Sequence, residues 1–190
     1  RRPEAPLPRH WVRSPPAHGR IGEIDVSEAV DAEGVVGVFT GAQVAAALGT
    51  APSALPMFPE AVRRPFVASE TVHYVGQPVV AVVAETKAQA IDAAELVIVD
   101  YDDLPAVVDP EAAAQDETVL HPAHGTNVLS RISSDDQADF GDCEVVVSER
   151  IVNQRLSGAP IEPRSGAAWW EGDRLVHYSA CQGAHPTKAV

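Results

Sequence analysis

Apolar and polar positions are most regular over residues 72–110, where they predict a strand, a helix and a second strand in succession. Residues 79–84 form an unbroken run of small apolar side chains, which is typical of a strand covered on both faces. Thr86 and Gln89 then have the spacing of a helix capping box. Apolar residues follow at spacings of three and four, so one stripe of a helix can lie back on the strand. An alternating pattern after Leu96 predicts the second strand.

Shorter patterns precede this unit. Strands are predicted over residues 10–13, 19–26 and 35–39, and helices over residues 27–32 and 44–48. Ser27 is expected to cap the first helix, and Gly34 to end it. Thr40 and Gln43 repeat the capping box ahead of the second helix. The N-terminal part of the chain therefore mixes strands and helices.

Two segments have compositions that interrupt regular structure. Residues 50–65 contain four prolines, which predicts a loop that packs on its own domain or, alternatively, on a partner subunit. Residues 116–142 are rich in acidic residues and predict an acidic linker between two domains. His121 and His124 in this linker could be metal ligands. No third ligand stands at a suitable spacing, which favours a solvated loop.

Strand patterns return after the linker, over residues 143–152, 167–170 and 175–179. The second and third flank Glu171-Gly172-Asp173 and predict a β-hairpin. Residues 153–164 carry polar side chains and two X-Pro steps, a composition common where a chain passes close to a cofactor or another domain. The chain then turns at Gly183 toward a helix.

Composition narrows the class of protein. A chain of 190 residues with 45% hydrophobic content can form one ordinary domain, or one domain and part of another. Cys143 and Cys181 make neither a disulfide framework nor a metal-ligand spacing, which favours a reduced, cytoplasmic setting. The net charge of -13 disfavours nucleic acid and anionic membrane surfaces as partners. No signal peptide or transmembrane run is present, and the Arg1-Arg2 start predicts a processed or trimmed end.

No nucleophile-base constellation, P-loop or glycine-rich dinucleotide motif is present, so these residues alone predict an α+β protein of undefined function. Six blocks carry a resemblance: RSPPAHGRIGEID (13–25), GVVGVFTGAQV (34–44), VHYVGQPVVAVVAET (72–86), AAELVIVDYDDLPAVVDPEAA (93–113), RIVNQRLSGAPIEPR (150–164) and SACQGAH (179–185). In this order they resemble the start of the large, molybdenum-binding subunit of the xanthine dehydrogenase, aldehyde oxidase and aerobic carbon monoxide dehydrogenase family. Pro16 and Ala184 depart from the family pattern, in a turn and at a helix entry.

The resemblance implies an α+β fold with an α/β hammerhead domain over residues 1–115. The acidic linker would cover residues 116–142, and residues 143–190 would be the incomplete start of a molybdenum-cofactor-binding domain. It also implies an oxidoreductase that hydroxylates an aldehyde or N-heterocycle, or oxidises carbon monoxide, with water as the oxygen source. The catalytic glutamate and the substrate-selecting loop would lie beyond Val190, so this chain alone is expected to be inactive.

The resemblance further implies a molybdenum-pterin cofactor in the complete subunit, with FAD and 2Fe-2S clusters on partner subunits or domains. The expected partners are the remainder of the large subunit, an iron-sulfur small subunit and an FAD-binding medium subunit, in a dimer of multisubunit units. Neither nucleic-acid binding nor membrane insertion is expected. The alternative is a non-catalytic protein-interaction module derived from the hammerhead fold.

The resemblance places no catalytic residue and no direct metal ligand in this chain. Gln182 matches the family's glutamine whose amide lies beside the apical oxo ligand of molybdenum. Its neighbour Gly183 is the second expected cofactor-binding position. A neutral amide can donate to an oxo group without adding net charge to a buried site. The alternative is a glutamine that satisfies its own turn. Four further positions are expected to support the site through hydrogen bonds: Asn153, Gln154, Glu162 and Arg164.

Overall fold

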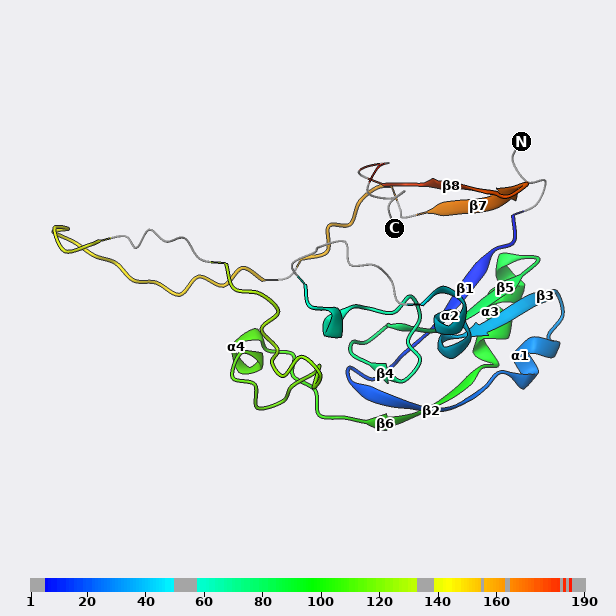
Figure 1. The fold of residues 1–190 in the computed structure, drawn as a ribbon, viewed down its shortest axis with the longest axis horizontal. Helices are drawn as coiled ribbons and strands as arrows, with labels where there is room; N and C mark the ends of the chain where they lie inside the picture. Colours follow the sequence, from blue (N-terminus) through cyan, green and yellow to red (C-terminus); the bar gives the residue numbers. More distant parts are fainter. Residues whose placement is uncertain are drawn as a thin grey trace. The chain divides into compact units, whose positions relative to one another are not determined.

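The computed structural model describes residues 6–49, 58–132, 139–154, 156–162, 165–181, 183 and 185 (Figure 1). The chain divides into two compact units: residues up to Ser130 together with His185 form the first, and the described residues from Arg131 to Gly183 form the second. The elements of the first unit are β1 (Arg9–Arg13), β2 (Gly19–Asp25), α1 (Ser27–Asp31), β3 (Val35–Thr40), α2 (Gly41–Leu48), a 3-10 turn (Glu60–Val62), β4 (Thr71–Val72), β5 (Pro78–Ala84), α3 (Lys87–Glu95), β6 (Ile98–Asp103) and α4 (Pro110–Ala113). None of the described helices is long and apolar enough to cross a membrane.

Strand β5 is the centre of the first sheet, which has the order β1-β5-β3 with antiparallel pairing on both sides. Trp11 of β1 and Phe39 of β3 both stand opposite Ala81. Val79 and Val80, whose side chains point to opposite faces of the sheet, are both completely buried. The prediction of a strand covered on both faces is therefore confirmed.

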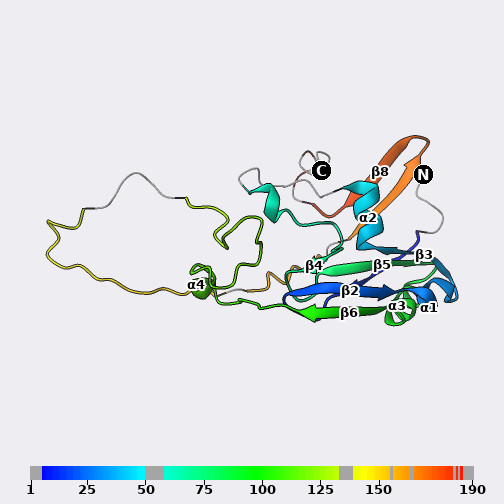
Figure 2. The ribbon, with the colours of Figure 1, turned by 60° about the horizontal axis from the view of Figure 1, so that its bottom comes forward.

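The second sheet has the order β4-β2-β6, and in both views β2 lies beside β6 (Figure 2). Helix α3 packs on β1 and β5 with Ala90 and Ala93 buried. The predicted strand, helix and strand are all present, as β5, α3 and β6, but the two strands lie in different sheets. The hydrophobic core joins both sheets to α3 and contains Ile21, Ala68, Val72, Val79, Val80, Val82, Ala93 and Ala94.

Both predicted capping boxes are present. The Thr86 backbone N–H donates to Gln89 Oε1 at 3.0 Å, and the Gln89 N–H donates to Thr86 Oγ1 at 3.3 Å. Thr40 and Gln43 make the reciprocal pair at the start of α2. Each box satisfies backbone donors that the first helical turn leaves without a partner.

The predicted cap of α1 by Ser27 is wrong. The N-cap position is Val26, and no side chain caps the helix. Ser27 instead donates from both its backbone N–H and its hydroxyl to Asp25 Oδ1, at 2.9 and 2.7 Å. These two bonds hold the pKa of Asp25 below its ordinary value. The aspartate thus uses the hydroxyl that the sequence pattern assigned to the helix.

Gln77 joins the turn before β5 to the chain that follows β1. Its side chain is buried, and its Oε1 accepts from the backbone N–H of His73 at 2.8 Å. The Gln77 N–H donates to the hydroxyl of buried Ser14 at 3.2 Å, and the Ser14 N–H donates back to the Gln77 carbonyl at 2.9 Å. Gln77 therefore serves the geometry of the strand start.

We expect Gln77→Ala to lower the free energy of unfolding by about 2 kcal/mol, because it removes the acceptor of the partly buried His73 N–H. Chemical denaturation of the chain measures this change. Gln115→Ala is the matched control, since that glutamine side chain is exposed. Equal stability of the two variants would contradict a structural role for the Gln77 amide.

Residues 58–130 depart from the predicted loops in two places. A single 3-10 turn forms in the proline-rich segment, whose residues 50–57 lie outside the described part. Helix α4 was not predicted, although Asp109 accepts from the Ala112 N–H at 2.8 Å and Pro110 occupies the first turn. Aspartate at the N-cap followed by proline is a helix-start signal that the sequence carried. The predicted domain boundaries at residues 115 and 142 stay predictions.

The second unit contains the predicted hairpin, formed by β7 (Gly166–Glu171) and β8 (Arg174–Ser179). The strand predicted over residues 143–152 is wrong, because these residues form no ladder and their apolar side chains are exposed; Val147 is 75% exposed. A strand persists only where its backbone groups pair with a neighbouring strand. No described strand pairs with this segment.

Candidate functional site

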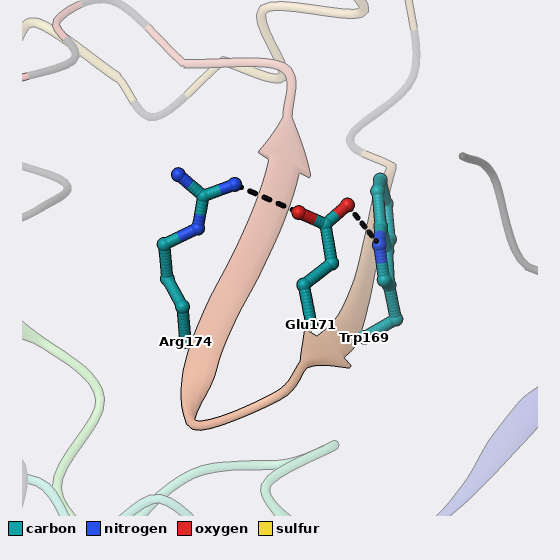
Figure 3. A network of polar contacts seen from close by, with 3 residues as sticks. All are labelled: Trp169, Glu171 and Arg174. Carbon is teal, nitrogen blue, oxygen red and sulfur yellow. Dashed lines mark hydrogen bonds and ion pairs between the residues drawn. The ribbon is translucent and has the colours of Figure 1, made fainter.

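The hairpin of the second unit precedes Gln182 and is closed by an acidic side chain at its turn. Arg174 Nη2 donates to Glu171 Oε2 at 2.7 Å, and Trp169 Nε1 donates to Glu171 Oε1 at 3.2 Å (Figure 3). The bond from Arg174, followed by that from Trp169, lowers the pKa of the Glu171 carboxyl below its ordinary value. Trp169 also stacks on Tyr178 of β8, with ring centroids 5.2 Å apart. The two strands are thus tied together by side chains as well as by their ladder.

The far end of the hairpin leads to the predicted cofactor-binding positions. The Ala180 N–H donates to the Ser165 carbonyl at 3.1 Å, which continues the pairing one residue past β8. Cys181 follows and is exposed, and Gly183 is partly buried. Gln182 itself lies outside the described residues, so its role stays a prediction.

The expected supporting residues are not gathered into a site in the described part of the chain. Asn153, Gln154 and Glu162 are exposed and lie in irregular segments. Arg164 lies outside the described residues. Among the residues that the structure describes, no group of three His, Cys, Asp or Glu side chains could hold a metal ion.

The first unit has a pocket of about 430 Å³ that the sequence patterns did not predict. His18, His73 and His121 line it together with Arg20 and Glu70. The three histidines are far apart in the sequence, so no motif spacing could have indicated that they meet. Only the pairing of β2 with β4 and β6, and the return of the chain after α4, brings them together.

The histidine rings stack in series. The centroid of His73 lies 4.4 Å from that of His121 and 5.5 Å from that of His18. Burial, followed by the charges of His121 and His18, lowers the pKa of His73 to about 4. Burial also lowers the pKa of His121. The prediction of a solvated loop is therefore wrong for His121, because its ring packs on the ring of His73.

Comparison with known proteins matches two parts of the chain to two known domain families. Residues 7–105 match the "Aldehyde oxidase and xanthine dehydrogenase, a/b hammerhead domain", and residues 120–190 match the "Molybdopterin cofactor-binding domain". The nicotine 6-hydroxylase large subunit of Paenarthrobacter nicotinovorans is 36% identical over 188 residues, which are 94% of this chain and 22% of that protein. The carbon monoxide dehydrogenase large chain of Hydrogenophaga pseudoflava is 31% identical and is matched over 24% of its length.

Among solved structures, quinoline 2-oxidoreductase from Pseudomonas putida 86 superposes with a TM-score of 0.84 at 34% identity. The superposition covers 93% of this chain and 23% of that chain. These matches define the class: a hammerhead domain followed by sequence of a molybdopterin cofactor-binding domain. The chain belongs to the aldehyde oxidase and xanthine dehydrogenase family. It spans about a fifth to a quarter of the length of the curated relatives named above.

Proposed function

We propose that this chain is part of the molybdenum-binding subunit of an oxidoreductase that hydroxylates an aldehyde or N-heterocycle, or oxidises carbon monoxide, with water as the oxygen source. The observation that carries the proposal is the pair of domain matches, in family order, over residues 7–105 and 120–190. We put N-heterocycles first among the substrate classes, because nicotine 6-hydroxylase and quinoline 2-oxidoreductase are named for such compounds.

A molybdenum-pterin cofactor would supply the two-electron redox centre of this reaction. The polar side chains of the second unit include the amides of Asn153 and Gln154, which can donate hydrogen bonds to the oxygen and nitrogen atoms of such a cofactor. In the proposal, the Gln182 amide would donate a hydrogen bond to the cofactor, and Gly183 would leave room for it beside the backbone. Asn153, Gln154, Glu162 and Arg164 would orient the groups around it through hydrogen bonds.

Electron transfer and assembly belong to the same proposal. FAD and 2Fe-2S clusters would lie on an FAD-binding medium subunit and an iron-sulfur small subunit, and the remainder of the large subunit would complete the active site. Support comes from relatives named as a large subunit, a large chain and subunit gamma of a dehydrogenase complex. Cys143 and Cys181 are both thiols, which is consistent with the cytoplasmic location that we propose.

Turnover in the reconstituted assembly tests this proposal. The chain is produced with the remaining large-subunit sequence and the electron-transfer subunits, and reduction of an artificial electron acceptor is followed with an N-heterocycle, an aldehyde and carbon monoxide. We expect turnover with one of these classes in the assembly and none with the chain alone. A stable, molybdenum-loaded assembly that oxidises none of them would contradict the proposal and favour a non-catalytic interaction module.

A further inference from the structure

We propose that His18, His73 and His121 form a pH-sensitive latch, which holds residues 116–130 against the hammerhead domain at neutral pH and releases them in mild acid. The latch is independent of cofactor binding and of the proposed reaction. It is built from three segments that meet at one pocket: the chain before β2, the chain after β4 and the chain after α4.

The central ring of the latch is His73, which has a histidine on each side. Its ring is inclined by 15° to that of His121 and by 29° to that of His18, so the three rings present their faces to one another. Ring faces carry no lone pairs, which explains why these histidines do not make a metal site. Neutral rings attract when stacked, whereas protonated rings at these separations repel.

His18 fixes one end of the stack. Its side chain is buried, and its Nδ1 lies 2.6 Å from the Pro105 carbonyl, which can only accept a hydrogen bond. The Nδ1 atom therefore carries a proton in the docked state. This bond anchors His18 to the chain just after β6, so the movable end of the stack is His121.

The surroundings of the stack do not neutralise added positive charge. Burial, followed by the charges of His124, His18 and Arg64, lowers the pKa of His121. Arg20 also lines the pocket, and Glu70 is the one carboxylate among its described lining residues. Glu70 is not among the groups that shift the pKa of His73 or His121. Protonation of His73 or His121 therefore adds a positive charge close to arginine and histidine side chains.

The pKa shifts give the direction of the pH dependence. The docked form of His73 has a pKa of about 4, compared with 6.5 for a solvated histidine, and only a hydrogen bond to the Leu120 backbone opposes the lowering. Between these values the released state binds more protons than the docked state. The docked population is thus greatest above pH 6.5 and falls as the pH decreases toward 4.

The segment can leave the pocket without losing its own fold. Asp116 accepts from the Thr126 hydroxyl and from the Asn127 N–H, both at 2.7 Å. The Asn127 amide donates to the carbonyls of Ala113 and Thr118, at 2.9 and 2.8 Å. These bonds join residues of α4 and the segment to one another. None of them involves a histidine, so protonation of the stack leaves them intact.

Hydrogen exchange of the full chain at several pH values tests the latch, after correction for the intrinsic exchange rate. Between pH 7.5 and pH 4.5 we expect protection of residues 116–130 to fall on the order of tenfold or more, with the midpoint between 6.5 and 4. Peptides from β5 serve as the internal reference and should keep their protection. Equal protection of residues 116–130 across this range would overturn the proposal.

A double variant, His73→Phe with His121→Phe, keeps two planar rings and removes their titration. We expect its protection over residues 116–130 to be independent of pH. The control is His177→Phe, at an exposed position of the hairpin, and its protection over the same residues should depend on pH as in the wild type. The same pH dependence in the double variant and the wild type would overturn the latch. If the double variant is unprotected at every pH, NMR titration of the wild-type histidines decides: a His73 midpoint well below 6.5, coincident with shifts in residues 120–123, supports the latch, and a midpoint at 6.5 overturns it.

Discussion

In the proposed assembly, we expect Gln182→Ala to lower kcat on the order of 10²-fold, which is the scale for losing one positioned hydrogen-bond donor. If Gln182 has the proposed role, the expected loss is in kcat rather than in KM, because the donor would act on charge that develops at the oxo group as the metal is reduced. Steady-state kinetics normalised to molybdenum content measure this effect. Gln115→Ala, in the exposed segment after α4, is the control and should turn over like the wild type.

Gln182→Glu separates donation from a role in the local turn. Glutamate has nearly the same shape as glutamine, but its carboxylate accepts hydrogen bonds and cannot donate one. We expect this variant to lose at least as much turnover per molybdenum as Gln182→Ala. Wild-type kcat in both variants would remove Gln182 from the active site. If the variants contain less molybdenum but turn over normally per molybdenum atom, Gln182 would instead help to retain the cofactor.

We expect Gly41→Ala to lower the free energy of unfolding of the chain by about 3 kcal/mol, the upper part of the range for inserting a methyl group into a packed site. Gly41 begins α2 and is buried. A methyl group at this position would collide with the carbonyl group of Ala68 and would lie 2.9 Å from the backbone nitrogen of Ser69. Helix propensity alone predicts the opposite sign, because alanine is favoured over glycine in a helix by about 1 kcal/mol.

The collision cannot be relieved by a side-chain rotation, because the opposing atoms are backbone. Ala68 is completely buried, and its N–H donates to the Pro78 carbonyl at 2.8 Å, at the start of β5. Displacing Ala68 would therefore disturb the central strand. Chemical denaturation gives the stability, and Ala42→Ser, at the next and exposed position of α2, is the control. An unchanged or raised stability of Gly41→Ala would contradict this close approach.

Local chemistry explains which elements could be predicted from the sequence. The β5 run, both capping boxes and the β7-β8 hairpin depend on residues within one or two turns of each other, and all were found. The cap of α1 failed because Asp25 competes for the hydroxyl of Ser27. The strand over residues 143–152 failed because a strand pattern states only that a segment can pair, and no described strand pairs with it.

Longer-range contacts could not be predicted from local patterns. The separation of β5 and β6 into two sheets depends on which strands each one pairs with, and the histidine stack depends on that pairing. Gln182 was selected by its position in a family motif rather than by any contact. The candidate site therefore depends on the family, whereas the core of the first unit follows from its own residues.

Molybdenum per polypeptide tests the central claim most directly. It is measured by elemental analysis in two samples, the chain alone and the chain produced with the products of neighbouring genes under an intact cofactor supply. We predict molybdenum in the assembly and none in the isolated chain, because in the proposed function the remainder of the large subunit completes the cofactor site. A stable assembly without molybdenum would contradict a role for this chain in a molybdenum-binding subunit.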